Sequence, residues 1–196
     1  MKGLSIEFYF DFISPYSYLA STGLSEFSSR FQIDIEWIPI NLPKLIKWSG
    51  NTPPTLIKSK AIYCLRDLKR WAKYLGVPFK MIKPLSFDSR PAMRTALALE
   101  GMDRVCFSQA IFNSIWSGEV DPKQQDWLEQ VVALNELPGV WLSQQNDRLD
   151  ELTQKALDKG AFGVPTFFLN KRVGRPEMFF GLDHMNLLAR ACEASG

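Results

Sequence analysis

Residues 8–18 read FYFDFISPYSY, a segment that joins an apolar strand to the start of a helix. Residues 8–13 are nearly all apolar, and an apolar run of this length is typical of a strand that is buried on both faces of a sheet. Ser14 fits the N-cap position of the helix that follows. Pro15 fits its first turn, where a missing N–H group leaves no hydrogen bond unmade.

Two interpretations of Ser14 follow from this position. A serine at an N-cap needs no further role, because its side-chain oxygen accepts a hydrogen bond from a backbone N–H group of the first turn. The start of a helix also presents free N–H groups and the positive end of the helix dipole, so it favours a bound anion to which the hydroxyl can donate. The local sequence favours the plain cap, and the choice depends on a second segment further along the chain.

The composition indicates one globular domain of ordinary size, or a domain with a substantial insertion. The 196 residues are 46% hydrophobic and 13% aromatic, which is enough for a full core. The net charge is +2 without an evident basic stripe, so no nucleic-acid partner is predicted. The apolar runs are too short to span a bilayer and the N-terminus lacks a signal-peptide pattern, so we expect no membrane association and a cytoplasmic location.

Cysteine and histidine usage argues against metal and hydrolase chemistry. Cys64, Cys106 and Cys192 are far apart and form neither a Cys-x-x-Cys pair nor a metal-binding spacing, so each is expected to be a small buried hydrophobic residue. His184 is the only histidine, and no metal is predicted. Ser14 lacks the Gly-x-Ser-x-Gly context of a hydrolase nucleophile.

The spacing of apolar residues predicts the order of the elements. A helix is expected over 15–30, and alternating apolar residues over 33–40 predict a second strand. Residues 42–54 are rich in Pro, Gly and Asn, which is typical of a loop. The helices expected after this loop share apolar residues three and four positions apart and cover residues 55–76, 91–100, 103–117, 124–136 and 146–160.

Strands return only near the C-terminus. Residues 166–169 and 178–180 predict a β-hairpin, and Asp183 is placed to cap a last helix over 184–194. The inward-facing residues of that helix are expected to be Met185, Leu187, Leu188 and Ala191. The whole pattern predicts an α/β fold in which a large all-helical insertion separates two halves of one sheet.

The second segment, GVPTF at residues 163–167, directly precedes the first of these late strands. Proline is acceptable at the beginning of a strand, where no ladder donor is needed. The bond between Val164 and Pro165 is compatible with either isomer, because the cis form costs an X–Pro bond only about 0.5–1 kcal/mol. The local sequence leaves the choice between cis and trans open.

The assembled pattern resembles a thioredoxin-like fold with a helical insertion, as in the DsbA-like group. In that group a redox Cys-x-x-Cys opens the first helix and faces a cis-proline loop, whereas residues 14–17 read SPYS here. Thiol–disulfide exchange needs a thiolate, so disulfide oxidoreductase activity is disfavoured. The resemblance divides the chain into a thioredoxin-like domain over 1–45 and 161–196 and an inserted helical domain over 46–160.

With serine in the redox position, the chain resembles 2-hydroxychromene-2-carboxylate isomerases and kappa-class glutathione transferases. The segments that carry this resemblance are FYFDFISPYSY (8–18), GNTPP (50–54), DLKRWA (67–72), FGVPT (162–166) and FGLD (180–183). The first and the fourth together are specific, and the resemblance covers nearly the whole chain.

The resemblance implies a site for a glutathione cofactor. Ser14 would donate its hydroxyl hydrogen to the glutathione sulfur, which favours the thiolate and lowers the thiol pKa. Val164 would pair its backbone with the cysteinyl part of glutathione, as an added strand does. Asp183 would bind the ammonium group of the γ-glutamyl end, or serve only as a helix cap. The implied catalytic residue is Ser14, and the implied cofactor site comprises Ser14, Val164, Pro165, Phe180, Gly181, Leu182 and Asp183.

Two positions depart from the family pattern. Leu182 stands where many relatives carry Ser or Asn, and leucine cannot donate a hydrogen bond to the γ-glutamyl carboxylate. His184 stands where arginine is frequent. The implied substrate site comprises Lys47, Trp48, Asn51 and Phe87, and for the two aromatic residues simple packing is the alternative role.

Three functions are compatible with these residues. In the first, a glutathione-dependent isomerase, the thiolate adds reversibly to an unsaturated, aromatic-type carbonyl compound and is regenerated. In the second, a kappa-like transferase, the same thiolate forms a conjugate with an electrophile. The third is a non-catalytic glutathione or peptide binder, which Leu182 favours. The expected partners are the small-molecule substrate and, since relatives tend to be dimers, a second copy of the chain.

Overall fold

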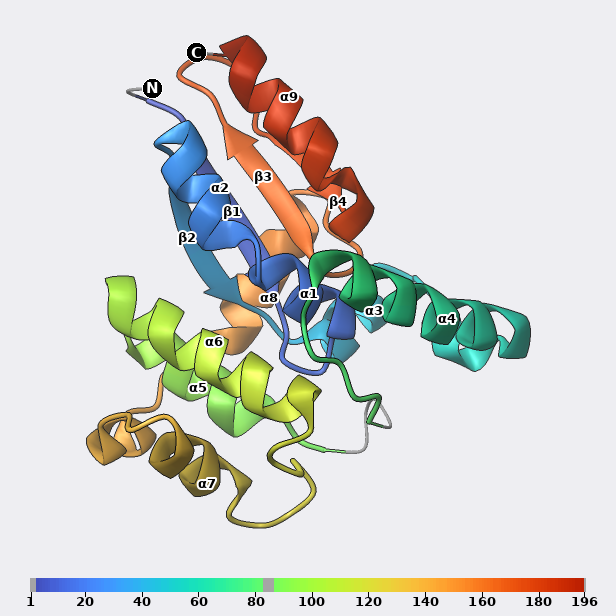
Figure 1. The fold of residues 1–196 in the computed structure, drawn as a ribbon. Helices are drawn as coiled ribbons and strands as arrows, with labels where there is room; N and C mark the ends of the chain where they lie inside the picture. The colour runs from blue at the N-terminus through green and yellow to red at the C-terminus, as the bar shows by residue number, and fades with distance from the viewer. Residues whose placement is uncertain (1–2, 83–86, 196) are drawn as a thin grey trace.

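The structure is a computed structural model that describes residues 3–82 and 87–195, and a four-stranded mixed sheet lies at its centre (Figure 1). The strands are β1 (Ser5–Phe10), β2 (Asp34–Pro39), β3 (Thr166–Asn170) and β4 (Glu177–Phe180), in the spatial order β2-β1-β3-β4. β1 pairs in parallel with β2 and antiparallel with β3, and β3 pairs antiparallel with β4. The two ends of the chain therefore form one sheet, as the sequence pattern predicts.

β1 is buried on both faces, which confirms the prediction from its apolar run. Successive side chains of a strand point to opposite faces. Phe8 and Phe10 lie on one face, where the Phe8 ring stacks on that of Phe167 at 5.2 Å between centroids. Tyr9 lies on the other face, where its ring meets that of Phe168 edge to face at 5.5 Å.

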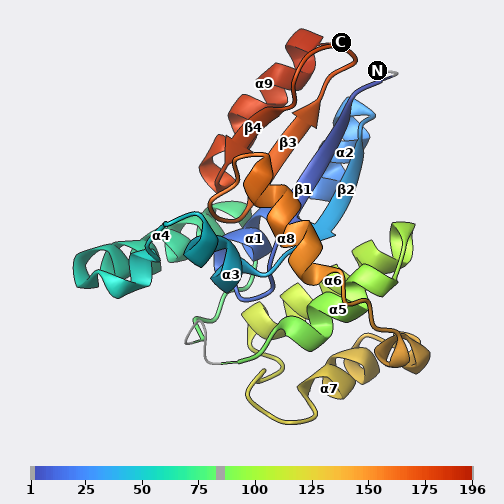
Figure 2. The same ribbon diagram turned by 180° about the vertical axis from the view of Figure 1, so that it is seen from behind.

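Helices cover both faces of the sheet. α2 (Leu24–Phe31) and α9 (Met185–Ser195) lie over one face (Figure 1), and α8 (Leu149–Asp158) lies over the other (Figure 2). α1 (Pro15–Ser21) follows the carboxyl end of β1. This arrangement places the start of α1 at the edge of the sheet where the loop before β3 also lies.

The helix expected over 15–30 is two helices, so the prediction of one is wrong. Thr22 is the C-cap of α1, and Gly23 is the N-cap of α2. The Thr22 hydroxyl donates to the carbonyl of Leu19 at 2.8 Å, and the Gly23 N–H donates to the carbonyl of Ala20 at 3.3 Å. Glycine has a low helix propensity and threonine here bonds back to the backbone, so the chain turns at this pair.

The middle of the chain is helical. Its elements are α3 (Leu42–Trp48), η1 (Pro54–Leu56), α4 (Lys58–Leu75), α5 (Arg90–Ala98), α6 (Gly101–Ser117), α7 (Trp127–Leu134), η2 (Gly139–Ser143) and α8. Within the described ranges no strand lies between β2 and β3, as predicted. α4 ends at Gly76, whose φ of +68° is the left-handed conformation that glycine adopts at a helix end.

α3 corrects the first half of the loop predicted over 42–54, whereas residues 49–53 contain no helix or strand, as expected. The Asn41 side chain accepts a hydrogen bond from the N–H of Lys44 at 3.1 Å and caps the helix. Pro43 occupies the first turn, where proline is tolerated. The Asn and Pro residues that suggest a loop therefore begin a short helix.

The C-terminal helix and the cysteines give three further corrections. A single 3-10 turn, η3 (Leu182–His184), precedes α9, and Leu187 is 49% exposed rather than inward-facing. Leu188 is fully buried, as predicted, and lies four residues before the equally buried Cys192 on one helix face. Cys106 is exposed and Cys64 is half-buried, so only one of the three cysteines is buried as expected.

The buried aromatic core continues from the sheet into the helical block. The Phe112 ring of α6 lies 5.5 Å from that of Phe10 and 5.0 Å from that of Phe12. The helices α5, α6 and α7 lie below one end of the sheet (Figure 1). The division at residues 45 and 160 stays a prediction, and one hydrophobic cluster runs across it.

Candidate functional site

Ser14 caps α1, as its position in the sequence predicts. Its side-chain oxygen accepts a hydrogen bond from the N–H of Ser17 at 3.2 Å, and Pro15 begins the helix. The Ser14 N–H group donates to the carbonyl of Asp11 at 3.0 Å, which closes the turn between β1 and α1. Ser14 is 4% exposed, so its side chain is buried at the start of the helix.

The second segment meets this cap. The Ser14 hydroxyl lies 3.5 Å from the carbonyl oxygen of Val164 and donates a weak hydrogen bond to it. The peptide bond between Val164 and Pro165 is cis, which decides the choice that the sequence leaves open. The two segments that together make the family resemblance specific, residues 8–18 and 162–166, therefore face each other.

Val164 has backbone groups available for a ligand. It is 8% exposed, and its N–H donates to no acceptor in the described part of the chain. Its carbonyl receives only the long bond from Ser14. A buried N–H group without a partner is rare in proteins, and an extended ligand that pairs as an added strand would satisfy it.

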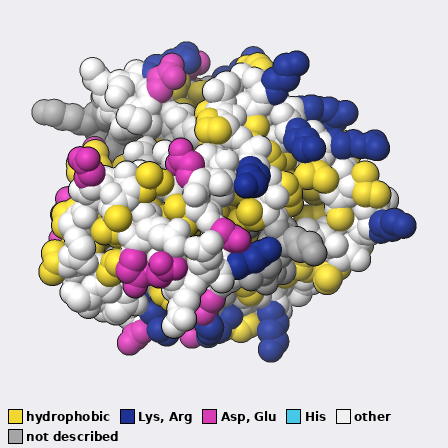
Figure 3. Space-filling model, turned by 60° about the horizontal axis from the view of Figure 1, so that its bottom comes forward, with side chains coloured by type: hydrophobic (Ala, Val, Ile, Leu, Met, Phe, Trp, Pro, Cys, Tyr) yellow, Lys and Arg dark blue, Asp and Glu magenta, His cyan; other side chains and the backbone are white. Residues whose placement is uncertain are grey.

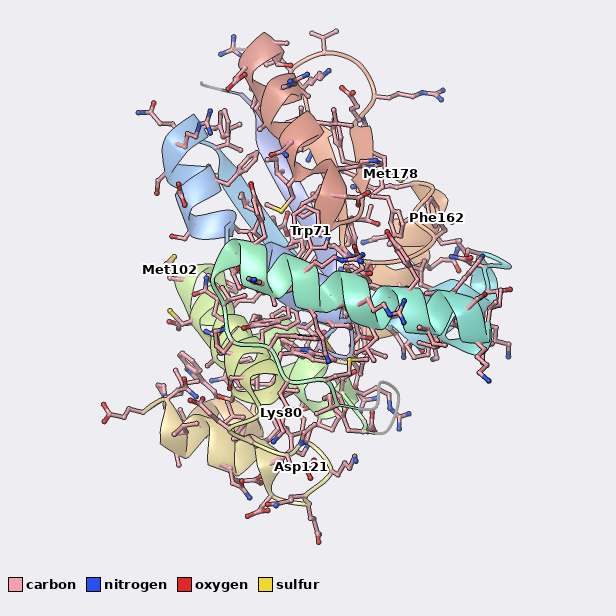
Figure 4. All side chains as sticks on the ribbon, turned by 45° about the vertical axis from the view of Figure 1, so that its right-hand side comes forward. Trp71, Lys80, Met102, Asp121, Phe162 and Met178 are labelled. Atoms are coloured by element: carbon pink, nitrogen blue, oxygen red, sulfur yellow. The ribbon has the colours of Figure 1, made fainter. Side chains whose placement is uncertain are left out.

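Phe180 and Gly181 border the same loop. The Gly181 N–H donates to the carbonyl of Pro165 at 2.9 Å, and the rings of Phe162 and Phe180 are 4.5 Å apart. A Cβ atom on Gly163 would stand 2.9 Å from the Phe180 ring, so only glycine allows this close packing. Figure 4 labels Phe162 on the segment that joins α8 to β3.

Asn51 also reaches this loop. Its side-chain amide donates to the carbonyl of Phe162 at 2.9 Å. Lys47 and Trp48 are exposed at the end of α3, and their predicted contact with substrate stays a prediction. Phe87 is half-buried, and its ring meets that of Trp127 edge to face at 6.0 Å between centroids. This contact matches the packing role that the sequence analysis gives as the alternative to substrate binding.

Leu182 and Asp183 differ in what they offer to a ligand. Leu182 is 5% exposed and belongs to the core, so it presents no polar group. Asp183 is exposed and makes no hydrogen bond or ion pair with any described residue. It lies inside η3, which begins one residue earlier, so the expected capping role is wrong, while the role as a charged ligand stays a prediction.

Asp11 is a buried carboxylate that the sequence reasoning missed. It is 1% exposed and accepts hydrogen bonds from the N–H of Ile13 at 3.1 Å, the N–H of Leu42 at 2.9 Å and the hydroxyl of Ser89 at 2.8 Å. Burial raises the pKa of this carboxyl to about 6, against the lowering effect of the three hydrogen bonds. The available signal was one acid within an otherwise apolar strand and turn.

Tyr16 joins α1 to α4. Its hydroxyl donates to the Asp67 carboxylate at 3.0 Å, and burial raises the pKa of this phenol above its ordinary value. Asp67 belongs to the DLKRWA segment of the family resemblance. A surface hollow of about 330 Å³ at the start of α4 is lined in part by Tyr63 and Cys64.

The exposed side of α4 is strongly basic. The helix carries six Lys or Arg residues and one acid, Asp67, whereas the net charge of the whole chain is +2. None of the six cations forms an ion pair with a residue that the structure describes. Figure 3 shows Lys and Arg side chains interspersed with apolar ones on the side toward which α4 projects. This face therefore carries a local excess of positive charge that the low net charge of the chain does not reveal.

Residues 3–82 and 87–195 hold neither a cluster of metal-binding side chains nor a membrane-spanning helix. No group of His, Cys, Asp and Glu side chains is arranged to hold a metal ion there. No described helix is long and apolar enough to cross a membrane.

The comparisons with known proteins agree with this geometry. The chain matches the DSBA-like thioredoxin domain family over residues 5–193. A 2-hydroxychromene-2-carboxylate isomerase of Pseudomonas putida is 32% identical over 95% of this chain and 93% of its own length. Glutathione S-transferase kappa 1 of Caenorhabditis elegans is 31% identical over 94% of this chain and 88% of its own length. A solved structure of 2-hydroxychromene-2-carboxylate isomerase superposes with a TM-score of 0.81 at 28% identity, covering 97% of this chain and 95% of that one.

Proposed function

The chain belongs to the DSBA-like thioredoxin domain family, as a relative of the 2-hydroxychromene-2-carboxylate isomerases and the kappa-class glutathione transferases, and from this premise we propose that it is a glutathione-dependent isomerase. The observation that carries the proposal is the approach of the Ser14 hydroxyl to a Val164 backbone whose N–H has no partner among the described residues. Serine in place of a redox cysteine suits a site that binds the thiol of a small molecule, because a hydroxyl can donate a hydrogen bond to the sulfur but cannot form a disulfide with it.

The residues present fit glutathione. The Ser14 hydroxyl is free to rotate from the Val164 carbonyl toward a sulfur atom, because its present bond is long. The Val164 carbonyl and N–H would then pair with the cysteinyl backbone of the tripeptide. Asp183, exposed and unpaired among the described residues, would accept the ammonium group of the γ-glutamyl end.

The chain would supply orientation and charge stabilisation. Glutathione, when bound, supplies a thiolate that adds to an unsaturated carbonyl compound and is released again. Ser14 would stabilise that thiolate by donating a hydrogen bond to the sulfur, and the N–H groups at the start of α1 would add to this effect. Lys47, Trp48 and Asn51, at or just beyond the end of α3, and Phe87 would orient the aromatic substrate.

One experiment tests the proposal and separates it from its alternatives. The protein is mixed with glutathione and with a panel of aromatic carbonyl compounds and electrophiles, and the fate of the thiol is followed by NMR. An isomerase returns glutathione unchanged while the substrate is rearranged. Consumption of glutathione into a conjugate would instead favour a kappa-like transferase, which the similarity to the nematode enzyme supports. Binding without turnover of any compound would favour the non-catalytic binder, which the buried Leu182 supports.

We also propose that the protein is a homodimer. Apolar side chains gather around η1 and the first half of α4, where Leu56 is 73% exposed and Tyr63 is 61% exposed. Groups of exposed apolar side chains of this kind frequently mark protein interfaces. Sedimentation of the wild type against a Leu56→Ser and Tyr63→Ser variant tests this, and a monomeric wild type would contradict it.

A further inference from the structure

The Asp11 carboxylate connects three segments that are distant in the sequence. Its Oδ1 accepts from the N–H of Ile13, in the turn before Ser14, and from the hydroxyl of Ser89, just before α5. Its Oδ2 accepts from the N–H of Leu42, the first residue of α3. One side chain thus holds the turn that presents Ser14 and the helix that leads to the predicted substrate residues.

The far end of α3 returns to the same site. Asn51, three residues beyond this helix, donates to the carbonyl of Phe162, and Phe162 lies two residues before Val164. Val164 in turn accepts from Ser14. The chain of contacts from Asp11 through α3 to the cis-proline loop therefore closes on the hydroxyl that begins α1.

No positive side chain among the described residues forms an ion pair with the buried Asp11. The described charged and titratable groups on β1, α1, α3 and α5 and on the segment just before α5 are Glu7, Tyr9, Tyr16, Tyr18, Lys44, Lys47, Asp88, Arg90 and Arg94. Asp88 pairs with Arg90, Lys44 pairs with Asp150, and Arg94 pairs with Asp147. Tyr16 donates to Asp67. Among the described residues, the charge that affects the Asp11 pKa is that of Asp88, and it raises the value in addition to the larger effect of burial.

We propose that Asp11 is a positioning residue of the glutathione site, which is correctly arranged when this carboxylate is ionised and is loosened when it takes up a proton. The proposal rests on the proposed function and names how that site responds to pH. An ionised carboxylate accepts from all three donors at once. A proton on Oδ2 would point at the N–H of Leu42, so the bond to α3 would be lost first.

The first test follows the backbone amides of Ile13, Ser14 and Leu42 by NMR in the free protein as pH is lowered through 6. We expect the three amides to shift with one common midpoint. Ser89→Ala removes a hydrogen bond that favours the ionised form, so this variant should raise the midpoint. Asp11→Asn should abolish the common transition. Different midpoints for the three amides would overturn the inference. An unchanged midpoint in the Ser89→Ala variant would also overturn it, even if Asp11→Asn does not fold.

The second test measures affinity for S-methylglutathione, a probe that carries no titrating thiol. Its carboxylates and amine keep their charges near pH 6. We expect the affinity of the wild type to fall about tenfold as Asp11 is protonated, the size of a lost hydrogen bond to a charged group. His184→Gln is the control and should retain this fall, because the fall is assigned to Asp11 and not to the histidine beside Asp183.

The two tests distinguish the two ideas. If S-methylglutathione binds to neither the wild type nor any variant, the proposed function fails, while the amide titration still decides whether Asp11 controls the Ser14 turn. If the probe binds equally well above and below the midpoint, the positioning role fails, while the glutathione site stands.

Discussion

The hydroxyl of Ser14 and the carbonyl of Val164 approach to 3.5 Å although 150 positions separate the two residues in the chain. The parallel pairing of β1 with β2 and its antiparallel pairing with β3 produce this approach, because the end of β1 and the start of β3 lie at the same edge of the sheet. The pairing of β1 with β3 therefore sets the distance between Ser14 and Val164.

Replacement of Ser14 by alanine tests the role of its hydroxyl. We expect Ser14→Ala to raise the pKa of the bound glutathione thiol and to lower kcat/KM by about 10- to 100-fold, the value of one hydrogen bond to a charged group. Ultraviolet absorbance of the thiolate as a function of pH measures the first effect. Ser17→Ala is the matched control, because the Ser17 hydroxyl on the same helix is fully buried yet has no hydrogen-bond partner among the described residues. An equal loss in both variants would contradict the role of Ser14.

The pKa of Asp11 gives a prediction for stability that runs opposite to the one for binding. Burial raises the folded-state pKa to about 6, above the ordinary value of 3.8, so the unfolded state holds fewer protons between these pH values. The contribution of Asp11 to folding is then fully present below the lower pKa and is lost as pH rises through 6. We expect the free energy of unfolding of the wild type, relative to that of Asp11→Asn, to fall across this range. Urea denaturation at a series of pH values measures the difference, and parallel curves for the two proteins would refute the assignment.

Phe112 tests whether the helical block and the sheet share one core. This residue is fully buried and packs on the rings of Phe10 and Phe12. We expect Phe112→Ala to cost about 3–5 kcal/mol, the usual loss for a buried phenylalanine, within a single cooperative transition. Leu187→Ala is the control, with an expected change within about 0.5 kcal/mol because that side chain is half-exposed. Two separate transitions in the wild type would show that the two parts fold independently.

The basic face of α4 predicts a salt-dependent rate. Glutathione carries a net negative charge, and fields from unpaired cations near a site raise the rate at which anions arrive. Replacement of Arg66, Arg70 and Lys73 by glutamine should lower kcat/KM at low ionic strength and leave kcat unchanged. The difference should vanish in high salt, where charges on the surface are screened. A defect that persists in high salt would point to a structural role for these residues.

The sequence predicted those parts of the fold that depend on local pattern. The buried strand, the Ser14 cap, the end of α4 at Gly76 and the helical middle follow from periodicity and from residues with specific backbone preferences. α3 was missed because Asn41 and Pro43 are common both in loops and at helix starts. The break at Gly23 was missed because the apolar spacing continues across it.

The missed parts of the site depend on contacts between distant residues. Asp11 meets Leu42 and Ser89 only in the folded chain, and no pattern in the sequence relates the three. Tyr16 and Asp67 are likewise separated by 51 positions. The approach of Ser14 to Val164 was reached through the family resemblance, since the residues of each segment alone favour a simple cap and leave the proline isomer open.

The alcohol at the head of α1 has a consequence for how the protein tolerates oxidants. An oxygen atom cannot form a mixed disulfide, so glutathione bound at Ser14 as proposed would leave by dissociation alone. Under the proposed function, no partner reductase would be needed to release a thiol from Ser14. When a cell's glutathione becomes oxidised, occupancy of the proposed site should decline with the concentration of reduced glutathione. Occupancy should recover as that concentration rises again, because no covalent adduct forms on Ser14.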